Sequence, residues 1–264
     1  MPQMNYPLKV LVVEAHPDEA EKYSGGTMRL LADKGAAIKF MSLTNGDAGH
    51  YQMDREPLKR RRAREAYTAA RHLGVLDYEI LDIHDGELVP DLAVRTAVIS
   101  AIRRWQADIV ITFHDDCPGH LDNRAAGRAV REASGFCTNG NIVPEVPPLA
   151  DAPICLKMTD YGAIDVHKHD VVVDVGASID AKLKACAAHA TQFYEFAPFE
   201  RGFLNEAPKI GDWAAERAFI LKYWPEFMYT QPGMVGAGEF AERFQLADYG
   251  RKVTANEVKA LLGV

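Results

Sequence analysis

Two adjoining segments decide the fold: LKVLVV at residues 8–13 and, one residue later, AHPDEAE at residues 15–21. The first is typical of a buried strand, and the second brings one imidazole and three carboxylates into the loop behind it. In an open α/β sheet, ligands bind in the crevice at the carboxyl ends of the strands. Burying these charges is costly unless a partner compensates them, and a divalent cation is such a partner. The alternative interpretation is a solvated turn whose aspartate caps the next helix.

Strand and helix patterns alternate through the first half of the chain. The predicted strands are residues 8–13, 38–43, 78–83 and 108–113. The predicted helices are residues 25–34 and 57–73, a helix capped by Asp91, and residues 123–133. This alternation implies right-handed crossovers and a parallel sheet, for which we expect the strand order 3-2-1-4. The polar loops at residues 16–21 and 114–123 would then face each other and share a site.

The second half has weaker patterns. Four prolines between residues 144 and 153 mark a long connection. Beyond it we predict strands at 154–158 and 171–175, helices at 179–196 and 213–223, and a terminal helix opened by a capping box at Thr254. The fold class is therefore α/β, a Rossmann-like parallel sheet flanked by helices. We predict a single domain over residues 1–264, with a βαβ core at about 8–135 and a C-terminal elaboration at 136–264.

Composition narrows the class of protein. The net charge of −7 over 264 residues argues against nucleic acid as a partner, and no stretch approaches the length of a membrane span. The apolar run near the N-terminus ends at Glu14 and lacks the pattern of a signal peptide. The four cysteines form no Cys-Xaa-Xaa-Cys pair, so we expect reduced, mostly buried thiols in a cytoplasmic protein. The oligomeric state stays open, with a homo-oligomer as one option.

Several motifs occur in a specific order. They are HPDE at 16–19, SGGT at 24–27, TNGDAGH at 44–50, HLDNR at 120–124 and AHATQ at 188–192. Together they resemble the LmbE/PIG-L family of metal-dependent N-deacetylases, whose signature is His-Pro-Asp-Asp-Glu after the first strand, with a later His-Pro-Asp-His-Arg. The resemblance covers roughly residues 8 to 195. It implies a hydrolase that removes acetyl groups from N-acetylated sugars or related small amides.

The resemblance also implies roles for individual residues. Carried over by position, the metal ligands are His16, Glu19 and Asn123. Asp18 corresponds to the family's general base. His120 corresponds to the residue that stabilises the oxyanion, and Asp122 is the expected partner that orients it.

The chain departs from the family at two ligand positions. Glu19 replaces aspartate, which keeps the charge and adds one methylene. Asn123 replaces histidine, and its amide oxygen suits Mn or Mg better than zinc, although zinc is the metal that the resemblance favours. A neighbour could replace the missing imidazole, with His114 as the first choice. Further candidates for that role are Asp115, Asp116 and His50; Cys117 is a weaker one.

Other residues support weaker hypotheses. Asp47, Arg62 and Asp85 could line the site, whereas His189 is more typical of a structural histidine. The pair at residues 25–26 indicates close packing of helix against sheet, because its spacing is not Gly-Xaa-Gly-Xaa-Xaa-Gly. The absence of the Gly-Xaa-Gly-Xaa-Xaa-Gly spacing also counts against a nucleotide-binding enzyme. A non-catalytic binding protein with a degenerate metal site is the main alternative to a deacetylase.

Overall fold

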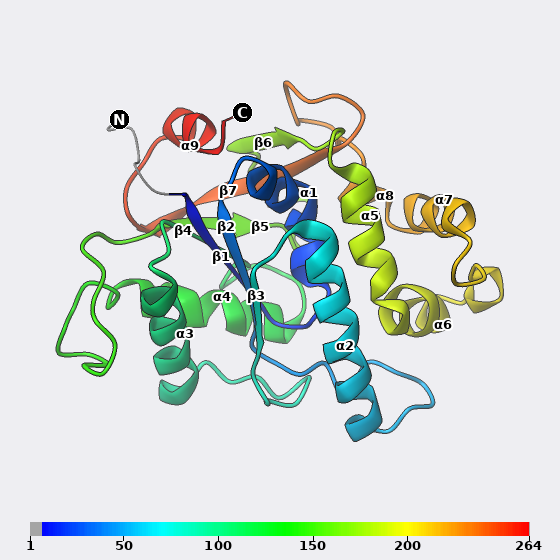
Figure 1. The fold of residues 1–264 in the computed structure, drawn as a ribbon, viewed down its shortest axis with the longest axis horizontal. Helices are drawn as coiled ribbons and strands as arrows, with labels where there is room; N and C mark the ends of the chain where they lie inside the picture. Colours follow the sequence, from blue (N-terminus) through cyan, green and yellow to red (C-terminus); the bar gives the residue numbers. More distant parts are fainter. Residues whose placement is uncertain (1–6, 264) are drawn as a thin grey trace.

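The computed structural model describes residues 7–263, and the strand that the opening segment predicts lies in the interior of its sheet (Figure 1). β1 (Lys9–Glu14) pairs in parallel with β2 (Ala37–Ser42) on one side and β4 (Ile109–Thr112) on the other. β3 (Asp77–Ile80) follows β2, also in parallel. The expected order 3-2-1-4 is therefore confirmed.

The second half of the chain extends the same sheet. β5 (Ile154–Met158) pairs in parallel with β4, and β6 (Val171–Asp174) forms the far edge. Between them lies β7 (Ala241–Gly250), which is antiparallel to both. Within the described residues the sheet has seven strands in the order β3-β2-β1-β4-β5-β7-β6. The α/β class is confirmed, and β7 makes the complete sheet mixed rather than purely parallel.

Helices cover both faces of the sheet (Figure 1). Val10 and Val12 of β1 face the core under α1 (Glu19–Asp33), α2 (Arg55–Leu73) and α5 (Ile179–Ala188). Leu11 and Val13 face the opposite core, under α3 (Leu92–Trp105) and α4 (Leu121–Ser134). Each such side chain contributes roughly 1.5–3 kcal/mol when fully buried, so a strand apolar on both faces is held firmly in the centre.

The rest of the C-terminal half is built from short helices. They are the π-helical segment η1 (Thr191–Phe196), α6 (Ala197–Glu200), the 3₁₀ turn η2 (Leu204–Glu206), α7 (Trp213–Tyr223), α8 (Pro225–Met228) and α9 (Ala255–Leu262). The capping box at Thr254 and the Asp91 cap of α3 are confirmed. The expected continuous helix over 179–196 is wrong, because α5 ends at Ala188. The backbone N–H and hydroxyl of Thr191 donate to Glu65 of α2 instead of continuing an α-helix.

A buried carboxylate of β7, Glu242, ties the two halves together. Lys182 of α5 lies 2.8 Å from Glu242 of β7, and both side chains are almost fully buried. The Glu242 carboxylate also accepts the backbone N–H groups of Gly26 and Thr27 at 2.8 Å each. An added Cβ at Gly26 would lie 2.7 Å from Val175, which explains the glycine pair as close packing of α1.

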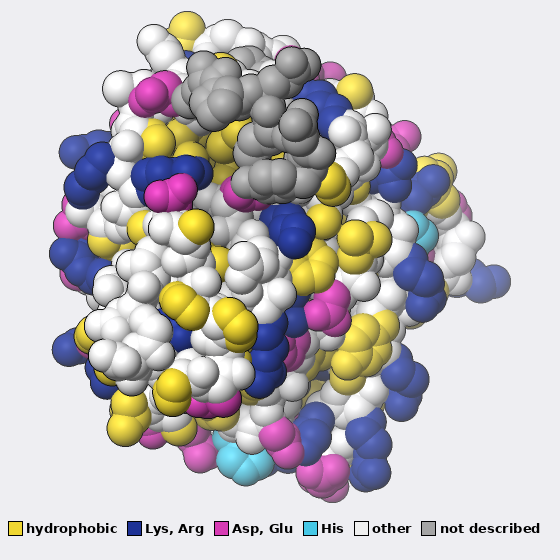
Figure 2. Space-filling model, turned by 60° about the vertical axis from the view of Figure 1, so that its left-hand side comes forward, with side chains coloured by type: hydrophobic (Ala, Val, Ile, Leu, Met, Phe, Trp, Pro, Cys, Tyr) yellow, Lys and Arg dark blue, Asp and Glu magenta, His cyan; other side chains and the backbone are white. Residues whose placement is uncertain are grey.

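The surface mixes charge signs. On the face shown in Figure 2, acidic and basic side chains are interspersed with hydrophobic ones outside the grey region. Across residues 7–263, no helix is both long and apolar enough to cross a membrane. All four cysteines are free, and Cys137, Cys155 and Cys186 are buried, as expected for thiols that serve as small apolar side chains.

Candidate active site

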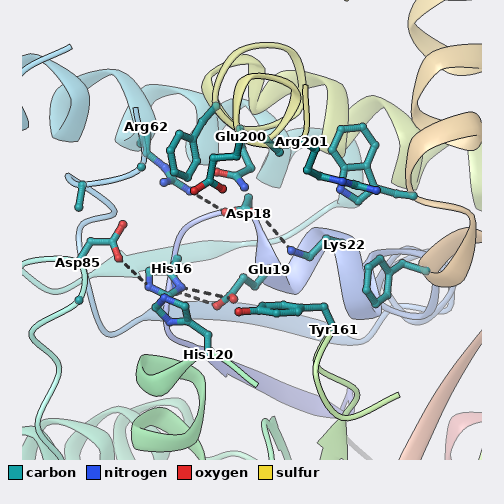
Figure 3. A pocket seen from close by; sticks show the side chains of 18 of the residues that line it. His16, Asp18, Glu19, Lys22, Arg62, Asp85, His120, Tyr161, Glu200 and Arg201 are labelled. Atoms are coloured by element: carbon teal, nitrogen blue, oxygen red, sulfur yellow. Dashed lines mark hydrogen bonds and ion pairs between the residues drawn. The ribbon is translucent and has the colours of Figure 1, made fainter. Parts of the chain in front are cut away.

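A cavity of about 740 Å³ opens at the carboxyl ends of the parallel strands (Figure 3). His16 follows β1, Asp85 follows β3 and His120 follows β4, so three strand ends contribute to its floor. Its wall comes from the C-terminal half, with residues such as Phe196 and Trp224. The predicted meeting of the loops after β1 and β4 is confirmed, because His16 and His120 lie ring to ring with centroids 4.8 Å apart.

His16 is surrounded by carboxylates. Its Nε2 lies 3.0 Å from Asp85 Oδ1 and 3.2 Å from Asp122 Oδ2, and its Nδ1 lies 3.4 Å from Glu19 Oε1. The other oxygen of Glu19 accepts the backbone N–H groups of Ala15 and His16, at 3.1 and 2.9 Å. These contacts fix Glu19 in the first turn of α1, not in a loop as the sequence suggested.

The carboxylates make this corner of the cavity strongly favourable for positive charge. Burial disfavours the imidazolium of His16, but Glu19, Asp122 and Asp85 outweigh burial and raise its pKa well above the ordinary value. Burial alone would raise the pKa of Asp85, yet the contact with His16 lowers it. Glu19 is likewise held below its ordinary pKa by His16. A cation is the group that such an arrangement stabilises.

Asp18 lies in a backbone conformation that few L-residues adopt, with φ at 125°. Arg62 holds it there: Nη2 donates to Asp18 Oδ1 at 2.6 Å and to the carbonyl oxygen of Pro17 at 2.8 Å. The second carboxylate oxygen of Asp18 is buried, has no hydrogen-bond partner and lies 3.7 Å from Lys22 Nζ. Asp18 thus offers one oriented, free oxygen to the cavity. Arg62 also lines the cavity, as the sequence suggested.

The glycine of the TNGD motif makes room for Arg62. Gly46 has φ at 67°, and an added Cβ would lie 2.9 Å from Arg62 Nε. Its carbonyl oxygen accepts a hydrogen bond from Arg62 Nη1 at 3.1 Å. The motif therefore shapes the cavity through Arg62, whose guanidinium in turn fixes Asp18, and its residues Ala48 and Gly49 also line the cavity.

The predicted contact between Asp122 and His120 needs correction. The Asp122 carboxylate faces His16 and accepts the backbone N–H of Gly86 at 2.7 Å, so it orients His16. Only the backbone N–H of Asp122 contacts His120, donating to Nδ1 at 3.3 Å. A neutral imidazole that accepts at Nδ1 carries its proton on Nε2, which leaves His120 with a donor. The backbone N–H of His120 is fixed by Asp160 Oδ2 at 2.9 Å.

Asn123 is buried, and neither atom of its side-chain amide has a hydrogen-bond partner within the described chain. It does not cap α4, because His120 occupies the cap position. A buried amide without partners is costly in a folded protein, so these orphan atoms point to a missing ligand. Asn123 is nevertheless absent from the described residues that line the cavity itself.

The other candidates for the missing imidazole lie elsewhere. His114 Nε2 contacts His167 Nδ1 at 2.8 Å, outside the cavity lining. Burial lowers the pKa of His114, and together with the neighbouring cations it lowers that of His167 to about 3. His50 pairs with Glu195 at 2.8 Å, Asp115 pairs with Lys157 at 3.0 Å, and Asp116 is exposed.

Two further candidates have structural contacts. His189 is fully buried and lies 3.1 Å from Glu21, which agrees with the structural role expected for it. Asp47 accepts the backbone N–H of Asp85 at 3.0 Å and contacts His84, so it shapes the loop that carries Asp85.

Sequence patterns missed several residues of the cavity. Tyr161 lines the cavity and follows β5 in a segment without a motif; Asp160 beside it, outside the lining, fixes His120. Lys22 lies one helical turn after Asp18, where it reads as an ordinary surface lysine. Residues from the C-terminal half complete the lining: Ile164, Gln192, Phe196, Ala197, Glu200, Arg201, Trp224, Glu226 and Phe227. Of these residues, Gln192 alone lies within one of the motifs, AHATQ.

The donor atoms fit a divalent cation. Two ligands with bonds of about 2.1 Å to a tetrahedral ion lie about 3.4 Å apart. His16 Nδ1 and Glu19 Oε1 have this separation, and Asp122 and Asp85 hold the other ring nitrogen, as the outer partners of metal-bound histidines do. A second grouping of donor atoms, from His16, Asp85 and His120, lies within 4.8 Å of one another. The nitrogen and oxygen donors suit zinc and its divalent neighbours.

Comparisons with known proteins agree with this geometry. Residues 11–134 match the family described as PIG-L: GlcNAc-PI de-N-acetylase. The diacetylchitobiose deacetylase of Thermococcus kodakarensis is 30% identical over 196 residues, which cover 71% of each chain. The N,N'-diacetylchitobiose deacetylase of Pyrococcus horikoshii has a similar fold, with a TM-score of 0.71, 24% identity, and coverage of 90% of this chain and 83% of that one.

One relative has a different reaction in its name. The 4-oxalmesaconate hydratase of Pseudomonas putida is 27% identical over 218 residues, covering 75% of this chain and 82% of that protein. The scaffold therefore occurs with more than one chemistry. The order of the motifs and the geometry of the cavity agree with the sequence identity to the archaeal deacetylase, which extends over more than two thirds of both proteins. The chain therefore belongs to the PIG-L (LmbE) family.

Proposed function

We propose that this protein is a metal-dependent hydrolase that removes the acetyl group from an N-acetylated sugar or a related small amide. The observation that carries the proposal is the Arg62–Asp18 arrangement: a buried carboxylate with one restrained and one free oxygen, beside the donor pair of His16 and Glu19. The names of the related deacetylases support the substrate class.

In this proposal His16 Nδ1, Glu19 Oε1 and the Asn123 amide oxygen hold the metal. Zinc is the proposed ion, with Mn or Mg as the alternatives that an amide oxygen would favour. When bound, such an ion lowers the pKa of a water molecule and polarises the substrate carbonyl. Asp122 and Asp85 contact the Nε2 side of His16 and so orient its ring.

Asp18 is the proposed general base. Its free oxygen accepts a proton from the attacking water, while Arg62 keeps the other oxygen in place. When the carbon–nitrogen bond breaks, the same carboxyl returns the proton to the departing amine. The products are acetate and a free amino sugar, so atoms and charge balance. Lys22 Nζ lies 3.7 Å from this free oxygen.

His120 is the proposed oxyanion donor. Its Nδ1 accepts from the backbone N–H of Asp122, so Nε2 carries a proton that can be donated to the acetyl oxygen as negative charge develops. Asp160 fixes the backbone of His120, which keeps this donor in place. Removing such a donor typically lowers kcat by about 10²–10³-fold.

The cavity wall suits a sugar. Its volume of about 740 Å³ lies within the roughly 300–1,000 Å³ of ordinary small-molecule sites. Tyr161 offers a ring, while Glu200 and Arg201 offer acceptors and donors for hydroxyl groups (Figure 3). Trp224 and Phe227 also line the wall. A small-molecule substrate is proposed on this basis, and the cytoplasm remains the predicted location.

The proposal is tested by acetate release from N-acetylglucosamine, N,N'-diacetylchitobiose and a glycoside of N-acetylglucosamine. The protein is stripped of metal and then supplied with zinc, manganese or magnesium. We expect acetate and free amine in equal amounts, and only after metal is restored. Absence of acetate from all three substrates with every metal would contradict the proposal.

Two alternatives give different results in the same experiment. A non-catalytic binding protein, suggested by the lost imidazole at position 123, would retain sugar binding by calorimetry without releasing acetate. A hydratase, suggested by the Pseudomonas putida relative, would add water to an unsaturated acid and leave the amide bond intact. Following the loss of the double bond by absorbance distinguishes that reaction from hydrolysis.

A further inference from the structure

A second cluster of metal-ligating side chains lies in the loop between β4 and α4. It consists of His114, Asp116 and Cys117, whose donor atoms all lie within 4.8 Å of one another. None of these three residues is among the described residues that line the main cavity. The cluster is therefore separate from the proposed deacetylase site, although its loop continues to His120.

His114 has the environment of a prepared ligand. Its side chain is buried, and Nε2 contacts Nδ1 of the buried His167 at 2.8 Å. A hydrogen bond between two imidazoles needs one acceptor nitrogen, so at least one ring is neutral. Metal-binding histidines characteristically hold their second nitrogen in such a contact, which fixes the ring and its tautomer. His114 Nδ1 is then the nitrogen left for an ion.

Cys117 approaches that nitrogen closely. Its Sγ lies 3.3 Å from His114 Nδ1. For bonds of about 2.3 Å to sulfur and 2.1 Å to nitrogen, two ligands of one tetrahedral ion lie about 3.6 Å apart. The observed separation is within a few tenths of an ångström of that value. A small rotation of the Cys117 side chain would therefore allow both atoms to bind one ion.

Access and donor type define the ligand. Asp116 is exposed and Cys117 is half-buried, so an ion reaches the cluster from solvent, whereas the other three cysteines are buried. Asp115 is engaged by Lys157 and Arg131, at 3.0 and 2.9 Å, so Asp116 is the carboxylate of the loop that no ion pair holds within residues 7–263. A set of thiolate, imidazole and carboxylate favours zinc over magnesium or calcium.

We propose that His114, Asp116 and Cys117 form a second metal site, which binds Zn²⁺ and keeps one coordination position open to solvent. Binding converts the Cys117 thiol to a thiolate: the S–H bond breaks, the proton passes to solvent and the sulfur–zinc bond forms. The site lies on the loop that presents His120, so its occupancy restrains the segment between β4 and α4. It does not depend on the proposed deacetylase reaction.

Cobalt substitution tests the proposal, because a cobalt–thiolate bond gives a charge-transfer band in the near ultraviolet that oxygen and nitrogen ligands do not. The full-length protein, kept reduced with a phosphine, is titrated with Co²⁺. We expect the charge-transfer band to saturate at one equivalent of Co²⁺ per protein. Added zinc should abolish the band by competition, and the Cys117→Ser variant should lack it. Cys137→Ala, which removes a buried thiol elsewhere, should keep the band.

Asp116→Asn should weaken cobalt binding by about tenfold or more, equivalent to about 1.4 kcal/mol. Asp151→Asn, at another exposed aspartate, should leave it unchanged. A measurement on the unaltered protein covers the case in which Cys117→Ser does not fold: zinc should slow alkylation of Cys117 by iodoacetamide at least tenfold, as mapped by mass spectrometry. A band that persists in Cys117→Ser, or alkylation that zinc does not slow, would overturn the proposal.

Discussion

Arg62 and Asp18 are joined by a 2.6 Å hydrogen bond that lies almost wholly out of contact with solvent. The same nitrogen of Arg62 also holds the carbonyl oxygen of Pro17, so one guanidinium fixes both the carboxylate and the strained backbone that carries it. Two segments separated by 44 residues thus build a single feature of the cavity. The orientation of the proposed general base depends on a residue of α2.

Arg62→Ala should therefore lower kcat for deacetylation by about a hundredfold with a smaller change in KM. The reason is that the general base loses its orientation, whereas the substrate keeps most of its contacts. Arg62→Lys should recover only part of the activity, since an ammonium cannot reproduce the two donors of the fork. Arg60→Ala is the matched control, since Arg60 lies on the same helix with 66% of its side chain exposed. Equal kcat values for Arg62→Ala and Arg60→Ala would show that Arg62 has no positioning role.

Metal affinity should follow the proposed ligands. Glu19→Gln and Asn123→Ala should each weaken zinc binding at least tenfold, or about 1.4 kcal/mol, because each removes a donor atom. Asn123→His should tighten it, since imidazole is a better zinc ligand than an amide oxygen. Calorimetric titration of metal-free protein measures all three.

The Asp85→Asn variant shows which of the two groupings of donor atoms around His16 binds the metal. If Asp85 only orients the ring, its substitution should cost less affinity than Asn123→Ala. The opposite ranking would assign the third ligand to Asp85 and remove Asn123 from the site. Circular dichroism of each variant shows that a change in affinity is not a loss of folding.

Much of the fold could be predicted because its strands and helices have clear local patterns. β1 is apolar on both faces, as a central strand must be, and the caps at Asp91 and Thr254 mark helix starts. β7 was not predicted. Its buried stretch includes Glu242 and Arg243, so the segment lacks an apolar period. The burial of Glu242 is compensated by Lys182 opposite it and by two backbone N–H groups of α1. That pairing links residues far apart in the sequence, and no local pattern contains it.

The candidate site likewise has a part that the sequence predicted and a part that it did not. The motifs predicted His16, Asp18, Glu19 and His120 in one cavity, and all four line it. The partner of Asp122 was predicted wrongly, because its side chain turns toward His16 from the first turn of α4. The wall of the cavity could not be predicted, since residues such as Arg201 and Trp224 lie at the ends of short helices whose positions depend on tertiary packing.

The Lys182–Glu242 pair should contribute strongly to stability. Glu242→Gln leaves a buried ammonium without its counter-charge and weakens the contacts to α1, so we expect a loss of roughly 3–5 kcal/mol in the free energy of unfolding. Urea denaturation measures this loss. Glu206→Gln, which breaks the exposed pair with Lys222, should change the midpoint little. A similar midpoint for both variants would mean that Glu242 and its buried contacts add little to the free energy of unfolding.

Glu195 should make stability depend on pH in the acid range. Burial would raise its pKa, but Arg61 and His50 lower it below the ordinary value of 4.5. A carboxylate with a lowered pKa stabilises the folded state above the unfolded value, and this contribution is lost as the pH falls through the folded value. The stability difference between the wild type and Glu195→Gln should therefore shrink below about pH 4.5.

Thermal unfolding of both proteins between about pH 7 and pH 3 measures this difference. Glu145→Gln, at an exposed position, should follow the wild type throughout. A gap between the wild type and Glu195→Gln that stays constant over the whole range would show that Glu195 titrates alike in the folded and unfolded states.

The central claim is that Asp18 directs water onto an acetamide carbon. It is tested most directly by a single-turnover reaction of the zinc-loaded protein with an N-acetylated sugar in water enriched in heavy oxygen. We predict one labelled oxygen in each acetate released, an equal amount of free amine, and a rate lowered about 10²–10⁴-fold in Asp18→Asn. Unlabelled acetate, or an Asp18→Asn variant as fast as the wild type, would contradict the account.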